Sequence, residues 1–374
     1  MREERESLRD TANVKTVRTH GVSVRSDEDI VEAASIDPRS DPRWLEFLAR
    51  HEAATIFHHP LWIQLIQETY HYASESVAFI KGEKLVGILP LLEVRSWLTG
   101  RRAICLPFSD YCVPLFEDAE SASRLFDHCV MLKEKKQWKY IELRGSVDSS
   151  IFVPGPRFKQ HRLDLTGDYE NVFRKFSKSQ TQRSILKAEK LGVVAERRKD
   201  AGAVEEFVQL NYSTRKKHGL PPQPDSFFWN LYELLISKNL GFVSTAKVSN
   251  ETIAAAVFLH YKDMVYYKFG ASKESFHGFR PNHKLMWDAI KWGCENGYKL
   301  FDFGRTDIDG DGLLRYKRGW GTKESDVIYH RLCEDKTPLS VTGKGVLEHL
   351  NPVLRKTPLP VLKVIGRVLY RHVG

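Results

Sequence analysis

The sequence predicts an α/β (α+β) protein built from two similar units. Its 374 residues are enough for two domains of ordinary size, each with its own core. Hydrophobic residues make up 42% of the chain and aromatic residues 11%, which is typical of a folded globule. Segments with helical and strand periodicity alternate, and one order of strand, polar turn and strand occurs twice.

Composition limits the function. The five cysteines form no CxxC pair and no Cys/His metal spacing, so we expect reduced cysteines, no bound metal and a cytoplasmic protein. The N-terminus is charged without the apolar stretch of a signal peptide, and no run of about 18 apolar residues occurs. Secretion and membrane spanning are therefore not expected.

The first unit is predicted over residues 22–155, after a polar segment, 1–21, that we expect to be disordered. Apolar residues at helical spacing between Asp41 and Tyr72, interrupted near Pro60, predict two helices and a turn. Further elements follow from periodicity: a hairpin over 77–94, a strand over 103–106, a helix over 119–137 and a strand over 139–143.

A polar loop, PFSDYCVPLF, follows the strand over 103–106. It holds Asp110 and Tyr111 between prolines and aromatic residues, so it is rigid and suited to substrate contact. Asp110 alternatively caps a turn.

The second unit is predicted over residues 156–335 and opens with a basic segment. Residues 174–199 carry nine Lys or Arg and two Glu, which accounts for most of the net charge of +9. A basic helical face of this kind contacts RNA, a phosphorylated lipid substrate or only water. A later connection, GLPPQP, forms a stiff lip after Arg215 that borders a cleft or only joins two helices.

The second unit repeats the first. Ile253 stands where Val86 stands, 167 positions earlier, and Asp302 lies 160 positions beyond Glu142. Similar spacings indicate a duplicated α/β unit. Only the second copy continues into GRTDIDGDGLLRYKRGW. We therefore expect the first unit to shape an acceptor pocket and the second to carry the chemistry.

The strand YYKFGAS, which contains Tyr267, leads through a Gly/Arg/Pro turn into a helix that begins near Asn282 and ends at Asn296-Gly297. A helix N-terminus with exposed N–H groups favours a phosphate or carboxylate. The strand over 300–303 and an Asp/Gly loop then deliver a set of cations. We expect a site formed by Asn282, His283, Arg305, Lys317 and Arg318, or alternatively an ordinary core helix with a solvated basic face.

Six motifs occur in order between about Phe57 and Glu324: LPFSDYC, TRKKHGLPPQP, YYKFGAS, RPNHKLMWDAIKWG, FDFGRT and LLRYKRGWG. Together they resemble the FemAB-like branch of the GNAT acyltransferase superfamily. The resemblance implies two tandem GNAT-like domains, each with a mixed, mostly antiparallel sheet flanked by helices. Well-known members transfer an amino acid from aminoacyl-tRNA to the amine of a peptidoglycan precursor, and relatives near exopolysaccharide loci are N-acyltransferases of uncertain substrate.

The resemblance assigns the chemistry to Tyr316-Lys317, in which the lysine stabilises the reacting carbonyl. Asp302 and Asp110 are the carboxylates best placed to accept the proton of the amine. No Ser/His/Asp or Cys/His set is apparent, so we expect direct attack without a covalent intermediate. The expected substrate-binding residues are Asp110, Tyr111, Arg215, Tyr267, Asn282, His283, Arg305 and Arg318.

The donor substrate is aminoacyl-tRNA or acyl-CoA, with no cofactor bound. The turn SFHGFRPNH offers only Gly278 in place of the glycine-rich CoA loop of GNAT enzymes, which disfavours acyl-CoA. The long helical hairpin of many tRNA-dependent members is missing, which disfavours tRNA. The expected acceptor is an amine-bearing cell-envelope precursor, which is either lipid-linked or free.

The sequence of the tail, residues 336–374, predicts a basic amphipathic helix. It either lies on an anionic membrane surface, at the inner face of the membrane, or docks on the second domain. A competing hypothesis for the whole chain is a non-catalytic binder that attaches polyanions or a membrane through the basic segment and this tail.

Overall fold

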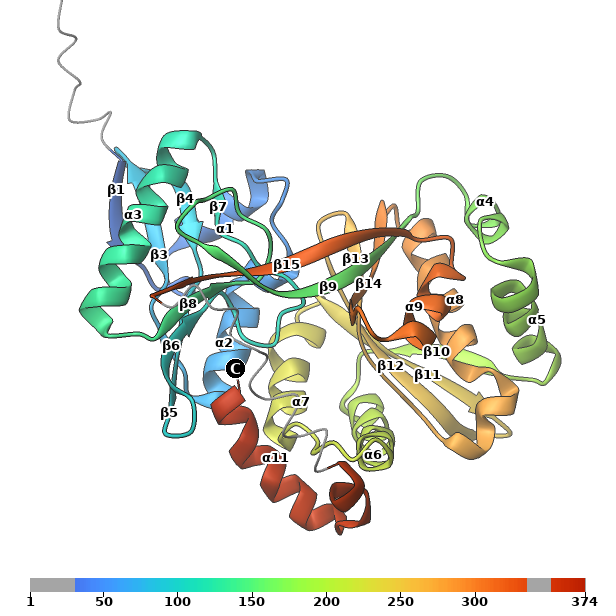
Figure 1. The fold of residues 1–374 in the computed structure, drawn as a ribbon. Helices are drawn as coiled ribbons and strands as arrows, with labels where there is room; N and C mark the ends of the chain where they lie inside the picture. The colour runs from blue at the N-terminus through green and yellow to red at the C-terminus, as the bar shows by residue number, and fades with distance from the viewer. Residues whose placement is uncertain (1–30, 335–350, 374) are drawn as a thin grey trace, which may run out of the picture.

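The computed structural model describes residues 31–334 and 351–373, arranged as two lobes joined by long strands (Figure 1). The predicted disordered segment, residues 1–21, and the start of the predicted tail lie outside the described residues. The elements of the first lobe are β1 (Val31–Ser35), α1 (Pro42–Arg50), η2 (Ile56–His58), α2 (Pro60–Tyr70), β2 (Ala73–Ser74), β3 (Val77–Lys81), β4 (Lys84–Leu89), β5 (Leu92–Ser96), β6 (Gly100–Ile104), β7 (Leu115–Phe116), α3 (Ala119–Lys136) and β8 (Tyr140–Leu143).

The second lobe also alternates helices and strands, and the described tail is helical over residues 351–356 and in α11. The elements are β9 (Val153–Asp164), α4 (Tyr169–Arg174), η3 (Lys178–Gln182), α5 (Arg183–Lys190), β10 (Val194–Arg198), α6 (Ala201–Lys217), α7 (Asp225–Leu231), η4 (Tyr232–Ile236), β11 (Gly241–Val248), β12 (Glu251–Tyr261), β13 (Met264–Ser272), η5 (Glu274–Phe279), α8 (Pro281–Glu295), β14 (Leu300–Asp307), α9 (Asp311–Arg318), β15 (Lys323–Cys333) and α11 (Leu359–Val373).

Two long strands are exchanged between the lobes. The strand β9 follows β8 in the chain but pairs with β14, and β15 follows β14 but pairs with β8. The two strands also pair with each other, so one sheet runs from β10 to β2 through both lobes, beside a small sheet of order β1-β3-β4-β7. The predicted boundary between residues 155 and 156 falls inside β9, which crosses from lobe to lobe (Figure 1).

The duplication predicted from the spacings is visible in the sheet. Each lobe contains one parallel strand pair joined by a helix: β6 and β8 align Ala103 with Ile141, and β13 and β14 align Val265 with Phe301. The connecting helices are α3 and α8. The predicted fold class, two tandem mixed α/β units with mostly antiparallel sheets, is confirmed.

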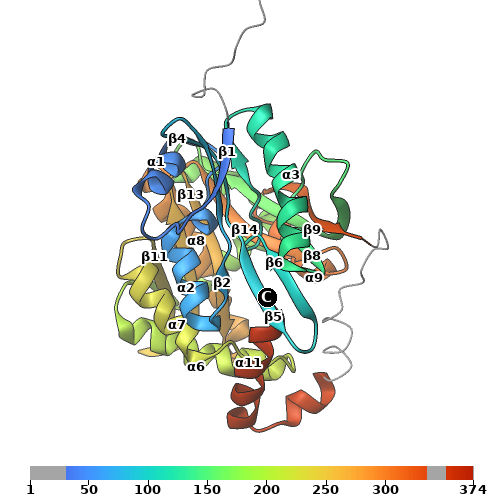
Figure 2. The same ribbon diagram turned by 90° about the vertical axis from the view of Figure 1, so that its left-hand side faces the viewer.

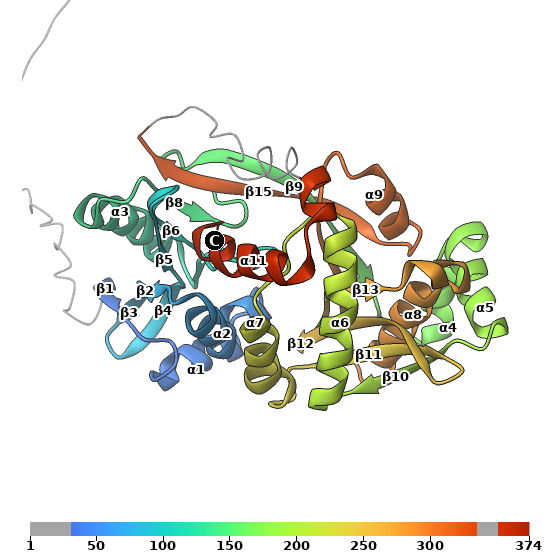
Figure 3. The same cartoon turned by 90° about the horizontal axis from the view of Figure 1, so that it is seen from below.

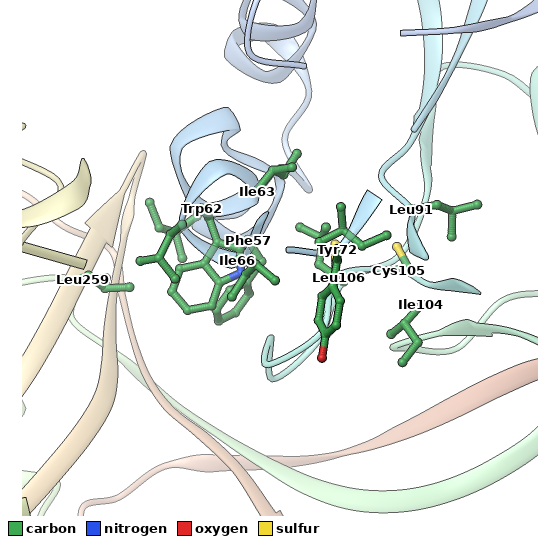
Figure 4. Packing of buried hydrophobic residues seen from close by; sticks show 14 of the residues in the cluster. Phe57, Trp62, Ile63, Ile66, Tyr72, Leu91, Ile104, Cys105, Leu106 and Leu259 are labelled. Atoms are coloured by element: carbon green, nitrogen blue, oxygen red, sulfur yellow. The ribbon is translucent and has the colours of Figure 1, made fainter. Parts of the chain in front are cut away.

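The core of the first lobe continues across the boundary. Phe57, Trp62 and Ile66 are fully buried in one cluster with Leu259 of β12, which reaches them from the second lobe (Figure 4). Because apolar surface of both lobes is removed from water together, the interface is part of the folded core. The lobes therefore hold a site between them in fixed geometry.

One local prediction is wrong and another is right only in part. The Asp/Gly stretch was expected to be a loop, but residues 311–318 form the helix α9, with Leu314 and Lys317 on its buried face. The hairpin expected over 77–94 is formed by β3 and β4, but it ends at Leu89, because the chain leaves β4 at Pro90 and enters β5 in the other sheet. Proline has no N–H to donate, so it ends the pairing.

The tail helix α11 docks on the protein. It contacts β5 of the first lobe and α6 of the second, as the two rotated views show (Figures 2 and 3). The Tyr72 hydroxyl donates a hydrogen bond to Tyr370 O at 2.9 Å, and Lys363 pairs with Asp225 at 2.7 Å. The docking alternative is confirmed, and it involves both lobes and not the second alone.

Candidate active site

The second parallel strand pair opens into a fork. Strands β13 and β14 pair only from Met264–Leu300 to Tyr266–Asp302, and beyond that point β14 pairs with β9 on its other side. Beside this fork, the side chains of Tyr267, Asn282 and Tyr316 line a hollow of ≈ 240 Å³ between β13, α8 and α9. Hollows of ≈ 210 and ≈ 360 Å³ adjoin it and share Asn282. Ligands of open α/β sheets usually bind at such carboxyl ends of parallel strands.

The equivalent fork in the first lobe is filled by its own chain. Beyond the pairing of Ile104 with Glu142, Cys112 forms an antiparallel bridge with Arg144, and Leu106 is fully buried. The two copies therefore differ at this position, since the first lobe bridges its strand ends with its own chain. The division of labour between the copies stays a prediction.

Lys317 is held against β14 just beyond the point where that strand leaves its pairing with β13. Its side chain comes from the buried face of α9 and is 3% exposed. The ammonium donates hydrogen bonds to Gly304 O at 2.7 Å and to Arg305 O at 3.3 Å. Burial lowers the pKa of Lys317 to about 8, against the opposing effect of the Asp110 and Asp302 carboxylates. An ammonium with a pKa near neutrality is typical of a functional site.

Asp302 is buried and fully engaged. Its Oδ2 accepts from Gln160 Nε2 at 2.7 Å and from Arg162 Nε at 3.3 Å, while Oδ1 accepts from the Gly304 N–H at 2.7 Å. Burial raises the pKa of Asp302, although the Arg162 guanidinium opposes the shift.

The first lobe contains a counterpart of the Asp302–Arg162 pair. Asp302 lies opposite Arg162 in the β14–β9 register, and Glu142 lies opposite Arg331 in the β8–β15 register, with a 2.7 Å ion pair. The same carboxylate–guanidinium pair thus braces both exchanged strands, including the one beside the closed fork. Part of the role of Asp302 is therefore structural.

Asp110 brings the first lobe into the site. Its Oδ2 lies 3.0 Å from the ammonium of Lys268 on β13, which also donates to Phe108 O at 2.9 Å. The side chain of Lys268 is 5% exposed, and its ammonium lies 5.0 Å from the ring centre of Phe57. Burial lowers the pKa of Lys268, and the Asp110 carboxylate opposes this. Two carboxylates and two ammonium groups therefore meet where the lobes join.

Gly304 makes room for this junction. Its φ of +69° is a left-handed conformation that favours glycine. A Cβ at this position would lie 3.5 Å from Asp110 Oδ2 and 3.6 Å from Tyr267 O. The turn places its N–H on Asp302 and its carbonyl on Lys317, so it links the two predicted catalytic residues.

Aromatic side chains form the walls. The Arg162 guanidinium lies over the Tyr111 ring, 5.0 Å from the ring centre, so Tyr111 forms the wall on the side of the first lobe. His283 packs edge-on against Tyr316 at 5.2 Å. Burial lowers the pKa of His283 to about 4, so its imidazole is neutral near pH 7. Tyr267 and Tyr316 face the hollow itself.

Three predicted binding residues have other partners. Arg305 lies over the Phe158 ring at 4.2 Å and donates to the Tyr329 hydroxyl at 2.5 Å, which in turn donates to Asp110 O. Arg305 thus braces the Asp110 loop. Arg318 is exposed and pairs with Glu324 at 2.7 Å. Arg215 donates to Pro221 O and to the Tyr370 hydroxyl, which anchors the tail. Arg305 and Arg318 do not converge with Lys317 as expected.

Lys268 and Arg162 were not predicted. Lys268 stands inside YYKFGAS, where a lysine between aromatic residues of a buried strand was an available signal. Arg162 lies in a strand with prolines and charges, and its position depends on the exchange of β9 between lobes, which no local pattern encodes.

The start of α8 is poor in donors. Pro281 occupies the first turn, and the His283 and Lys284 N–H groups both donate to Arg280 O. Proline has no N–H, so this N-terminus offers one donor fewer to a pyrophosphate than an ordinary helix. The hollow beside it is therefore a weak cradle for coenzyme A.

The outer face of α9 has a separate hollow of ≈ 540 Å³. Arg315 and Arg318 line it together with Ser177 and Gln180 of the basic segment. Lys317 points the other way, so this hollow is distinct from the fork. Exposed cations continue from it along the segment at Lys178, Arg183, Lys187 and Lys190.

Within residues 31–334 and 351–373, no cluster of three or more His, Cys, Asp or Glu side chains suits a metal ion. Over the same ranges, no helix combines the length and the apolar character needed to cross a bilayer.

Comparison with known proteins agrees with this geometry. A family model described as an acetyltransferase (GNAT) domain matches residues 175–318, which include the open fork and Lys317. Lipid II:glycine glycyltransferase of Staphylococcus aureus (strain USA300) is 29% identical over 121 residues. That match spans 31% of this chain and 28% of the relative, so it covers only about a quarter of the length of that protein.

Solved structures share the fold over most of the chain. The structure of FemX superposes with a TM-score of 0.64 at 16% identity, covering 80% of this chain and 96% of FemX. A tandem GNAT protein from the clavulanic acid biosynthesis pathway gives a TM-score of 0.53 at 9% identity, covering 83% of this chain and all (100%) of that one.

Proposed function

Because this chain is FemAB-like and carries a GNAT acetyltransferase domain, we propose that it is an N-acyltransferase that acts on an amine of a cell-envelope precursor. The acyl group is an aminoacyl or simple acyl group, and the acceptor is a peptidoglycan or polysaccharide precursor. The observation that carries the proposal is the buried ammonium of Lys317 between two carboxylates at the base of the open fork.

The chemistry is direct transfer. The neutral amine attacks the carbonyl carbon of the donor ester or thioester, the new C–N bond forms, and negative charge collects on the carbonyl oxygen. The Lys317 ammonium stabilises that oxygen, and one aimed cation of this kind contributes roughly 3–4 kcal/mol. The carbon–oxygen or carbon–sulfur bond then breaks, and the leaving group takes up a proton while the amine loses one.

Asp110 is the better candidate for accepting the amine proton. Its side chain is 21% exposed, whereas that of Asp302 is 1% exposed and already accepts bonds at both oxygens. A group that receives a proton must reach the substrate directly or through one water. Asp302 is then a positioning residue: it accepts the Gly304 N–H, and Gly304 O accepts a hydrogen bond from Lys317. Tyr316, Tyr267, Asn282 and His283 bind the donor in the fork, and Tyr111 faces the acceptor.

We favour aminoacyl-tRNA as the donor, with no bound cofactor. The donor-poor start of α8 argues against coenzyme A. The hollow beside Arg315 and Arg318 lies between the outer side of α9 and the basic segment with its exposed cations. These cations suit the phosphate backbone of a tRNA whose acylated end enters the fork. Acyl-CoA is the second candidate, supported by the match to an acetyltransferase domain.

The named glycyltransferase supplies the acceptor class. Its name gives lipid II, a lipid-linked cell-wall precursor, as its substrate. A lipid-linked acceptor would place this chain in the cytoplasm at the inner face of the membrane. Lys363 and Arg215 fix the tail in place, and Arg318 and Arg305 support the site without touching the acyl group.

The donor class is tested by mass spectrometry. The protein is incubated with a lysine-containing stem peptide and, in separate reactions, with charged tRNA pools or acyl-CoA mixtures. The proposal predicts a peptide heavier by one aminoacyl residue in the tRNA reaction only. A mass gain from acyl-CoA alone would select the second donor. No gain in either reaction, with polyanion binding retained, would favour the non-catalytic binder.

A further inference from the structure

A hairpin tip and the tail helix form one exposed surface. The turn between β5 and β6 carries Trp97, which is 80% exposed, and Leu98, which is 54% exposed. The Trp97 ring lies 5.7 Å from the His372 ring at the end of α11. The Thr99 hydroxyl and the Arg102 guanidinium both donate to His372 O. The hairpin tip is therefore fixed against the helix.

An apolar stripe continues along α11 from this junction. Val361, Val364 and Val368 follow one another at spacings of three and four, and His372 is four residues further. The three valines are 48%, 60% and 51% exposed. Because residues at these spacings share one helix face, the stripe leads without interruption to Trp97.

Docking on the protein does not explain the stripe. The opposite face of α11 is the docked one: Leu362 is fully buried, and Gly366 packs so closely on Pro222 that a Cβ would collide with its carbonyl. The docked face leaves the valines outside. A helix that only covered its own protein would carry polar residues there.

The exposed charges on the hairpin and on α11 itself have one sign, although Asp225 of α7 pairs with Lys363. Neither the hairpin over 92–104, apart from the buried Glu93, nor α11 contains an Asp or Glu. Arg367 and Arg371 are exposed beside the valines, and Arg95, two residues from Trp97, is 67% exposed while pairing with the buried Glu93 at 2.7 Å. An apolar strip with cations along it and a tryptophan at its end matches an anionic lipid surface, where tryptophan rings sit at the headgroup level.

We propose that the β5–β6 hairpin tip and the outer face of α11 form one docking surface for an anionic lipid bilayer. Trp97, Leu98 and the three valines enter the headgroup region, and Arg95, Arg367 and Arg371 contact lipid phosphates. The surface lies at the junction of the two lobes (Figure 3).

The surface also adjoins the substrate hollows. His218 lines the hollow of ≈ 360 Å³ next to the fork, and its pKa is lowered by burial and by nearby cations that include Arg355 in the segment before α11. A bilayer held by α11 would bring a lipid-linked acceptor to that edge. This role rests on the proposed function, whereas bilayer binding itself does not require acyl transfer.

Vesicle flotation tests the proposal with the full chain. We expect wild-type protein to float with phosphatidylcholine vesicles that contain roughly a third phosphatidylglycerol and to stay unbound with phosphatidylcholine alone. The variant Val364→Glu/Val368→Glu is expected to bind at least tenfold more weakly. Met131→Glu on α3 changes an equally exposed apolar residue elsewhere, and it is expected to bind as wild type does.

The hairpin is tested separately, because Trp97 contacts α11 at the last turn of the helix, away from the buried Leu362. Trp97→Ser is expected to weaken flotation severalfold. Brominated lipids are expected to quench the part of the tryptophan fluorescence that is lost in Trp97→Phe. Either result supports the surface even where the helix variant undocks α11, which circular dichroism and thermal melting would reveal.

Several outcomes would overturn the proposal. If wild-type protein does not float with anionic vesicles, it has no such docking surface. Binding that survives both patch variants but is lost in Lys187→Gln/Lys190→Gln belongs to the basic segment. A concentration-dependent dimer that Val364→Glu/Val368→Glu dissociates would assign the stripe to a second copy. Transfer to a soluble stem peptide separates the two proposals: vesicle binding without transfer refutes only the proposed function, and transfer without vesicle binding refutes only the surface.

Discussion

Raising the pH through 8 tests the charge of Lys317. The mechanism requires the ammonium form, because only a cation stabilises the oxyanion. The pKa of Lys317 is lowered from 10.5 to about 8 by burial, so the side chain is mostly protonated at pH 7 and mostly neutral at pH 9. The transfer rate must therefore lose this contribution as the pH rises through about 8.

The expected profile combines this loss with the titration of the acceptor. An acceptor amine with a pKa of about 10.4 gains tenfold in its neutral form per pH unit below that value. The logarithm of the rate then rises with a slope near 1 up to about pH 8 and stays level until about pH 10. A Lys317 that worked as a base would instead give a slope near 2 below pH 8 and near 1 above it.

The assay is single-turnover transfer with enzyme in excess over a labelled aminoacyl donor, corrected for hydrolysis without enzyme. Lys317→Arg is the control, since a guanidinium stays charged over the whole range. Its residual activity is expected to keep rising with a slope near 1 to about pH 10. A wild-type profile without a break near pH 8 would refute the assigned role.

Stability gives an independent readout of the same pKa. A lysine whose pKa is lowered on folding binds fewer protons in the folded than in the unfolded state between pH 8 and 10.5, so stability rises with pH in that window. The gain is at most about 3 kcal/mol. Urea unfolding of the wild type should show this rise relative to Lys317→Met, whose side chain does not titrate. Equal pH dependence of both proteins would mean that the ammonium is solvated.

The duplicated ion pairs give a comparison: Glu142→Gln is expected to destabilise the fold by about 3–5 kcal/mol in urea unfolding, because Arg331 is 12% exposed and loses its partner. Asp302→Asn is expected to cost less, because Arg162 is 35% exposed and water can solvate it. Only Asp302→Asn should also lower transfer per folded molecule, and equal loss in both would make Asp302 purely structural. Gly304→Ala is expected to cost about 1–2 kcal/mol through its positive φ, with a larger proportional loss of transfer than of stability, and unchanged kinetics would contradict its linking role. Lys268→Met should lower kcat more than it raises the KM for the acceptor, because it releases Asp110, which accepts the amine proton, and an unchanged kcat would count against this.

Local patterns predicted the elements that depend on local sequence. The helix α3 begins after Asp118, whose side chain caps Ser121 N, and the helix α8 ends at Asn296, both close to the predicted residues. The parallel pairs of β6 with β8 and β13 with β14 agree with the duplication read from Glu142 and Asp302. Apolar periodicity and capping residues carry this information within one element.

The rest of the site depends on contacts between distant segments. Arg162 reaches Asp302 only because β9 is exchanged between lobes, and Lys268 reaches Asp110 only because the lobes share a core. The Asp/Gly run before Lys317 suggested a loop, since these residues disfavour helices, yet burial of Leu314 stabilises α9. In α9, tertiary packing outweighs the local conformational preference of the Asp and Gly residues. The sequence pattern of one segment does not contain the packing energy.

The central claim is that the Lys317 ammonium stabilises the reacting carbonyl in the open fork. Its most direct test is the single-turnover transfer rate of Lys317→Met against wild type at pH 7.5, with both proteins shown to be folded by thermal melting. The account predicts a rate lower by about 10²–10³-fold, the equivalent of one aimed cation. A Lys317→Met protein that transfers at the wild-type rate would contradict it.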